Sequence, residues 1–204
     1  MLVSGEGEVF GEPDTLAAEF AVETVSSTVD EALKSAEAAA TRMRDALVKA
    51  GMARADLQTS DIGVSSRLDD NEKITGYTVN QGLSAKIRDL PRAGAIISAA
   101  IAAAGDAARL NGVSFTIEND GALLAEARKK AFADARGKAE LYAREAGRPL
   151  GRVVRVTEGV PDGGEVPMLR DHRALAAAPL PIEPGRHRLA VDVTVEWALG
   201  PLPG

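Results

Sequence analysis

The stretch "VSGEGEVFGEPDT", residues 3–15, opens the chain with glycines at positions 5, 7 and 11. A dinucleotide-binding loop needs the spacing G-x-G-x-x-G between a strand and a helix, so that backbone N–H groups meet a phosphate. Here the third glycine comes one residue too late, and the glutamates between the glycines would repel an anion. The stretch instead predicts a strand over residues 3–10, whose glycines permit a close backbone approach, and a turn over residues 11–14.

Alternation of apolar and polar residues, the period of a strand with one buried face, recurs along the rest of the chain. It predicts six further strands, at residues 16–23, 58–68, 77–88, 113–117, 152–157 and 189–197. The polar stretch 69–73 predicts a hairpin loop between the second and third of these. The apolar sides of the strands predict a core that includes Phe20, Val79, Leu83, Phe115, Val193 and Val195.

Three helices are predicted from apolar residues spaced three and four apart. The first begins at the capping box of Thr28 and Glu31 and ends at Gly51. Its expected apolar face is Val29, Leu33, Ala36, Ala40, Met43, Leu47 and Ala50. The second has Pro91 in its first turn and ends at Gly105.

The third helix is the longest, from Asn119 or Asp120 to Gly147. Its expected apolar face is rich in alanine, which allows close packing on whatever the helix covers: Leu124, Ala127, Ala131, Ala135, Ala139, Tyr142 and Ala146. Its charged residues invite an interpretation as a membrane-surface helix. Acids are interspersed with the bases, however, with Glu126 and Lys130, and Glu140 and Arg144, at i,i+4 spacing, so we predict a solvent-exposed face with ion pairs.

The order of elements is therefore β-β-α-β-β-α-β-α-β-loop-β. It predicts an α+β fold with a largely antiparallel sheet and helices packed on one face. We expect a single domain over residues 1–204. Within it, residues 158–185 hold five prolines and four glycines without periodicity. Their apolar side chains predict a segment that packs along a surface of this chain or of a neighbour.

The composition excludes several classes of protein. The chain has 204 residues, 45% of them hydrophobic and 26% charged, which is enough apolar material for a globular core. The net charge of −6, the scattered Lys and Arg residues, and a total of one Trp, two Tyr and four Phe argue against a nucleic-acid partner. Without cysteine there are no disulfides, thiolate nucleophiles or Cys-based metal sites.

The sequence also bears on location. It has no apolar run of about 18 residues or more, so no transmembrane helix is predicted. The N-terminus shows no pattern of an export signal. The sequence alone thus leaves a cytoplasmic protein, or an exported one whose signal is absent from this chain.

Several stretches, in order and over nearly the whole chain, resemble the SIMPL-domain family. They are "VSGEGEVFGEPDTLAAEFAVET", "DLQTSDI", "ITGYTVNQGLSAKIRDL", "ISAAIAAAGDAARLNGVSFTIEND", "EARKKAFADARGKAELYAREAGRPLGRVVRVTEG" and "APLPIEPGRHRLAVDVTVEWAL". The ending "VEWAL" is most similar to actinobacterial members. The resemblance implies an α+β domain in the bacterial periplasm, cell envelope or outside the cell, self-association, which in one member gives a ring-like oligomer, and a link to envelope stress tolerance. It implies no enzymatic activity and no catalytic residues.

The residues themselves offer weak candidates for chemistry. His172 and His187 would bind a metal only if they met carboxylates such as Asp171 or Glu183. The pairs at positions 69/70 and 118/120 lie in expected turns, where carboxylates are solvated. Four serines, Ser4, Ser26, Ser66 and Ser84, lack a nucleophile-elbow motif. We predict no catalytic, cofactor-binding or metal-binding residues.

Two functions remain open. The first is a non-enzymatic envelope protein that forms homo-oligomers through strand edges and the proline-rich segment, with possible peripheral association with the envelope. The second is a monomeric module that binds a small ligand, or an uncharacterised enzyme, with its site under residues 158–185. The first is favoured because no set of polar residues with a recognised spacing defines a site.

Overall fold

The structure is a computed structural model that describes residues 1–159 and 182–201. Its contacts divide the chain into two compact units. Among the described residues, the first unit comprises Met1–Glu12 and residues 117–159 and 185–201, and the second comprises residues 13–116 and 182–184. The elements follow the predicted order and the sheets are antiparallel, so the α+β prediction is confirmed.

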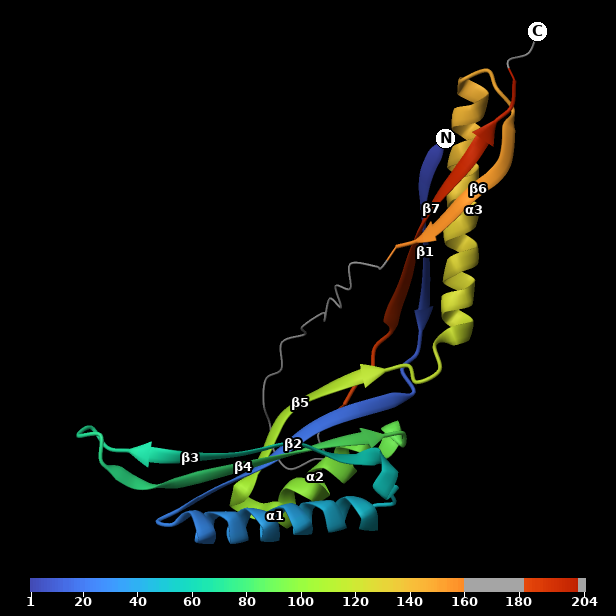
Figure 1. The fold of residues 1–204 in the computed structure, drawn as a ribbon. Helices are drawn as coiled ribbons and strands as arrows, with labels where there is room; N and C mark the ends of the chain where they lie inside the picture. The colour runs from blue at the N-terminus through green and yellow to red at the C-terminus, as the bar shows by residue number, and fades with distance from the viewer. Residues whose placement is uncertain (160–181, 202–204) are drawn as a thin grey trace. The chain divides into compact units, whose positions relative to one another are not determined.

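The first unit is a three-stranded antiparallel sheet in the order β1 (Leu2–Gly11), β7 (His187–Leu199) and β6 (Leu150–Glu158). The long helix α3 (Gly121–Glu145) packs on one face of this sheet (Figure 1). Strands β1 and β7 pair without interruption, with Leu2 opposite Glu196 at one end and Gly11 opposite His187 at the other. The two ends of the chain therefore build one sheet.

The alanines of α3 allow it to lie very close to β1. Ala127, Ala131, Ala135, Ala139 and Ala143 form its buried face. A Cβ atom added at Gly5 would overlap the carbonyl oxygen of Ala131, and one added at Gly7 would overlap that of Ala127. The opening glycines thus serve packing, as predicted. The expected apolar face is wrong at its end, because Tyr142 is 56% exposed and Ala143 is buried in its place.

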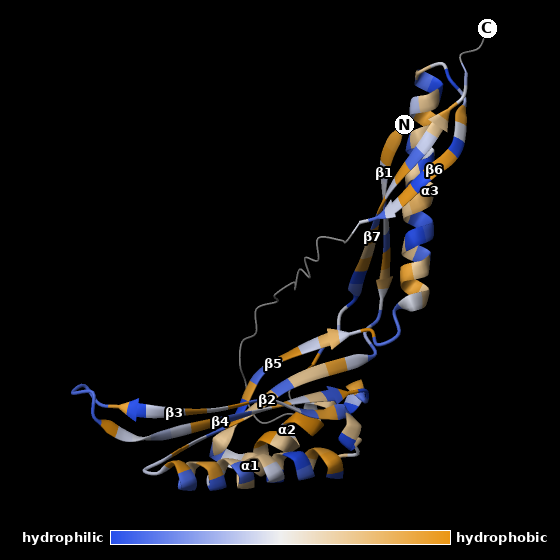
Figure 2. Ribbon diagram, viewed as in Figure 1, coloured by the Kyte–Doolittle hydropathy of each residue, from blue (hydrophilic) through white to orange (hydrophobic). Residues whose placement is uncertain are grey.

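The second unit is a four-stranded antiparallel sheet in the order β3-β4-β2-β5. Its strands are β2 (Thr15–Ser26), β3 (Leu57–Leu68), β4 (Ile74–Ile87) and β5 (Ala108–Thr116). Two helices, α1 (Val29–Lys49) and α2 (Ala93–Ala104), cover one face, and α2 is apolar over most of its length (Figure 2). Single 3₁₀ turns occupy Arg54–Asp56, Leu90–Arg92 and Gly105–Ala107.

Capping explains where α1 begins, and glycines explain where the three helices end. The backbone N–H of Glu31 donates to Oγ1 of Thr28 at 3.3 Å, which is half of the predicted capping box. The other half differs, because the Glu31 carboxylate accepts a hydrogen bond from Ser27. Gly51, Gly105 and Gly147 follow the three helices with positive φ, the conformation that ends a helix at least cost in a glycine.

The core of the second unit lies where the helices cover the central strand. Leu16, Ala18, Phe20 and Val22 of β2 are buried, together with the α1 face of Ala32, Ala36, Ala39, Met43 and Leu47. The prediction for α1 is therefore wrong at Leu33, which is exposed. Phe20, Val79, Val193 and Val195 are buried as predicted, whereas Leu83 and Phe115 are only partly buried.

Candidate functional site

The residues considered for chemistry do not converge in the described part of the chain. His172 and Asp171 lie outside the described residues, His187 begins β7 and Glu183 is exposed. No group of three or more His, Asp or Glu residues within 1–159 and 182–201 could hold a metal ion. The ligand site considered under residues 158–185 falls mainly on residues outside the description. Ile182, which is described, packs against the core of the second unit.

Among the carboxylates and serines considered, Asp69, Ser4 and Ser84 have local structural roles. Asp69 accepts hydrogen bonds from the backbone N–H groups of Asn71 and Lys73 in the β3–β4 turn, at 2.9 Å each. Asp120 is the N-cap residue of α3. Ser4 hydrogen bonds to Thr194 on the neighbouring strand, and Ser84 donates to Glu19. These contacts stabilise turns and strand pairs and assemble no reaction centre.

The edges of the two sheets are the more informative feature. A strand at an edge presents unpaired N–H and C=O groups, which can pair with another chain unless they are covered. Strands β1 and β6 are the edges of the first sheet, and β3 and β5 are those of the second. The four edges differ in how far the rest of the chain covers them.

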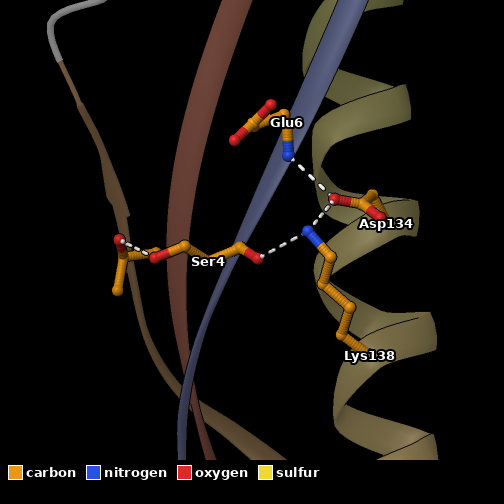
Figure 3. Close-up of polar contacts among 5 residues, drawn as sticks. Ser4, Glu6, Asp134 and Lys138 are labelled. Carbon is orange, nitrogen blue, oxygen red and sulfur yellow. Dashed lines mark hydrogen bonds and ion pairs between the residues drawn. The ribbon is translucent and has the colours of Figure 1, made fainter.

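The edge of β1 is covered by side chains of α3. Lys130 Nζ donates to the carbonyl oxygen of Glu8 at 3.1 Å, and Lys138 Nζ donates to that of Ser4 at 3.3 Å. Between them, the backbone N–H of Glu6 donates to Oδ2 of Asp134 at 3.0 Å (Figure 3). Three outward-facing backbone groups of β1 are thus bound by side chains of α3, which covers part of this edge.

The spacing of these contacts follows from the geometry of the two elements. Four residues of a helix advance about 6 Å, and two residues of a strand advance about 6.6 Å. Because these advances are nearly equal and the two elements run in opposite directions, positions 130, 134 and 138 of α3 lie beside positions 8, 6 and 4 of β1. The hydrogen bond from Lys138, at 2.7 Å, and then that from Glu6 lower the pKa of Asp134. The same carboxylate raises the pKa of Lys138.

The edge of β6 is open in the described part of the chain. Helix α3 lies mainly over β1 and β7 and contacts β6 little. Val153, Val154 and Val156 are consequently between 41% and 53% exposed. Arg128 of α3 reaches over to Glu158 at the end of the strand with Nε and Nη2, at 2.9 to 3.1 Å. This pair lowers the pKa of Glu158 and raises that of Arg128.

A groove of about 520 Å³ runs between α3 and β6. Phe132, Ala133, Val156 and Val193 form its apolar lining, and its charged residues are Arg128, Lys129, Arg136 and Glu158. Phe132 also contacts Trp197 of β7, with ring centroids 6.3 Å apart. The open strand edge and the groove thus form one continuous surface of the first unit.

Strand β3 is the most exposed edge in the second unit. Of its twelve residues only Leu57 is partly buried. Ile62, Val64 and Leu68 are between 50% and 63% exposed, although they are apolar. Neither helix lies over this strand, and the turn joining it to β4 extends beyond α1 (Figure 1). At the opposite edge, β5 leaves Leu110 and Val113 less exposed.

The charged face of α3 has ion pairs, but not the two that its sequence spacing predicted. Glu140 pairs with Arg136 at 2.8 Å, and Asp134 pairs with Lys138. Lys130 instead binds the backbone of β1. The sequence reasoning therefore missed the role of positions 130, 134 and 138. The sequence signal for this role was a row of polar residues at i, i+4 and i+8 next to the alanine face of the helix, in a chain that also contains a glycine-rich strand.

No helix among the described residues is both long and apolar enough to cross a membrane.

The described part of the chain is thus an α+β protein with antiparallel sheets and exposed strand edges. The chain belongs to the SIMPL family, described as a protein of unknown function (DUF541), whose model matches residues 1–197. It is 34% identical to the 26 kDa periplasmic immunogenic protein of Brucella melitensis over 211 residues, which cover 97% of this chain and 83% of that protein. The protein of the same description from Brucella abortus matches to the same extent.

Proposed function

We propose that this chain is a non-enzymatic protein of the bacterial periplasm or cell envelope that associates with copies of itself through strand β3. Membership of a family without an assigned activity, and relatives described as periplasmic, support the location and the absence of catalysis. The association would serve the stability of the envelope under stress. Cell fractionation of the native organism tests the location, and survival of a deletion strain under envelope stress tests the role.

The observation that carries the proposal is the exposure of β3. A long strand with an unpaired edge and exposed Ile62, Val64 and Leu68 is a template for pairing with another strand. Ile62 lies opposite Gln81 and Val64 opposite Val79, whose side chain is buried beneath the helices. Ile62 and Val64 therefore point to the helix side of the sheet, where a second copy would cover them.

The sequence of β3 also suits antiparallel pairing with itself. If two copies pair with Val64 opposite Val64, then Asp61 of each strand lies opposite Arg67 of the other. These two positions bound the regularly paired stretch of β3, whose register with β4 shifts between Thr59 and Ile62 and again between Arg67 and Leu68. Neither Asp61 nor Arg67 forms an ion pair with a described residue. Opposite charges across such a pair stabilise it, whereas like charges would oppose it.

Light scattering at several protein concentrations tests the proposal. We expect a mass that is a discrete multiple of one chain for the unchanged protein. The substitution Val64→Lys places two ammonium groups against each other at the centre of the pair, and lysine is a natural means of blocking strand edges. We expect this variant to have the mass of a single chain at the same concentrations.

The matched control is Val113→Lys, which places a lysine on the other edge strand of the same sheet at a similarly exposed valine. We expect it to keep the mass of the unchanged protein, and circular dichroism should show both variants folded. A single-chain mass for the unchanged protein at every concentration would contradict the proposal. So would dissociation by Val113→Lys with no effect of Val64→Lys.

A further inference from the structure

Strand β6 and the groove beside it form a second open surface, distinct from β3. We propose that this surface binds an extended segment of another protein in which apolar and acidic residues alternate. The segment would add a fourth strand to the first sheet, next to β6. The inference does not depend on self-association through β3, because the two surfaces belong to different units.

The backbone of β6 supplies the first part of the argument. The strand pairs with β7 on one side, and no described strand pairs with it on the other. Addition of a peptide strand to a free edge is a common mode of recognition, in which main-chain hydrogen bonds give affinity. At β1 three such groups are bound by Lys130, Asp134 and Lys138, so β6 is the less covered edge of this sheet.

The groove supplies pockets for alternate side chains of the added strand. Val153 lies opposite Trp197 and Val156 opposite Val195, two residues buried beneath α3. Val153 and Val156 therefore face the helix side, where Phe132 forms the wall of the groove. Every second residue of an added strand would enter this groove, because side chains alternate between the faces of a sheet. The surface there is apolar, so these residues of the partner are expected to be apolar.

The charges indicate acidic residues at the other positions. Arg155 lies opposite Glu196 on the outer face of the sheet, and Arg152 precedes it by three residues. Neither of these arginines, nor Lys129 at the groove, forms an ion pair with a described residue. Of the three bases in the groove, Arg128 pairs with Glu158 and Arg136 with Glu140, so Lys129 is the one in excess, in a chain whose net charge is −6. This locally positive surface complements an acidic segment.

The same charges disfavour a second copy of β6 as the occupant. Any antiparallel pairing of two β6 strands near their centres brings Arg152 and Arg155 of one copy close to those of the other. Like charges on neighbouring strands destabilise the pair. An acidic segment has no such penalty and would pair with both arginines.

The test uses the full chain and a fluorescein-labelled peptide of seven residues that alternates glutamate and valine. We expect saturable binding by fluorescence anisotropy, weakened by added salt because exposed charges are screened. A peptide with lysine in place of glutamate should not bind. The double variant Arg152→Gln/Arg155→Gln should bind about tenfold more weakly, from about threefold per exposed ion pair. The control Arg67→Gln, on the edge strand of the other unit, should bind as the unchanged protein does.

Three results would overturn the inference. The first is no binding at millimolar peptide, which would mean that the edge is occupied or closed. The second is equal binding of the lysine peptide or of the arginine double variant. The third is a change of mass in light scattering for Arg152→Gln/Arg155→Gln without any binding of the peptide, which would assign β6 to contacts between copies of the chain.

Discussion

Gly5 and Gly7 have no side chain because the backbone of α3 lies where a Cβ atom would be. The carbonyl oxygens of Ala131 and Ala127 approach these two glycines directly. Small residues on both elements are thus what lets α3 and β1 pack closely, and close packing brings the side chains of α3 within reach of the strand edge. The sequence shows the two sides of this contact as separate patterns: glycines two residues apart in β1 and alanines four residues apart in α3. The close packing that each pattern permits was predicted correctly.

At the residue scale, Gly7→Ala should destabilise the protein by about 1–3 kcal/mol, because the added methyl group must displace a helix backbone rather than a flexible side chain. Gly63→Ala is the matched control. It lies in an edge strand, and nothing lies within 4 Å of the position of its Cβ atom. Its effect should stay within about 0.5 kcal/mol. Urea denaturation followed by circular dichroism measures both, and equal effects would show that α3 does not lie so close to β1.

At the element scale, one of the contacts that cover the β1 edge is made by a carboxylate and should depend on pH. The pKa of Asp134 is lowered in the folded protein, first by Lys138 and then by the N–H of Glu6. A carboxyl group whose pKa is lower in the folded state stabilises the fold above its unfolded pKa of about 4. This stabilisation is lost as the pH falls through the folded pKa.

The free energy of unfolding of the unchanged protein should therefore fall more steeply below about pH 4 than that of Asp134→Asn. The variant keeps the shape of the side chain without its charge, so it should already be less stable at pH 7. Urea denaturation at pH 7 and pH 3 measures the difference. Parallel loss of stability in the two proteins would indicate that Asp134 contributes nothing through its charge.

The elements also show what the sequence could and could not predict. Periodicity and caps predicted the order of strands and helices, because both depend on neighbouring residues. Periodicity did not predict which strands lie at an edge, since that depends on pairing between distant segments. The apolar residues of β3 and β6 consequently looked like ordinary strand residues. Phe115 has the orientation predicted for it but is only partly buried, because β5 is also an edge.

At the scale of the whole molecule, the first unit is assembled from both ends of the chain and the second from the segment between them. Met1 donates from its amino group to the carbonyl oxygen of Trp197 at 2.7 Å, across almost the full length of the sequence. The first unit therefore cannot form until both ends of the chain are present. We keep the prediction that residues 1–204 unfold as a single domain, because the chain passes repeatedly between the units.

Two spectroscopic signals can test this prediction. Trp197 is the single tryptophan of the chain and is buried in the first unit, so its fluorescence follows that unit. Far-ultraviolet circular dichroism follows both units. We expect the two denaturation curves to coincide, as they do when unfolding is cooperative. Separate midpoints would divide the chain into two domains.

A disulfide cross-link tests most directly whether β3 joins one copy of the chain to another. The chain has no cysteine, so a single introduced one can react only with its counterpart in another copy. Pairing centred on Val64 sets the two copies of this residue directly opposite, within the Cα separation of about 4.4–6.8 Å that a disulfide spans.

We expect Val64→Cys to form a covalent dimer rapidly under mild oxidation, as seen by non-reducing gel electrophoresis. The control is Ser65→Cys. Its two copies would be offset by two residues along the strands, beyond the reach of a disulfide, and should remain unlinked. Absence of a Val64→Cys dimer, or equal cross-linking of both variants, would contradict the claim.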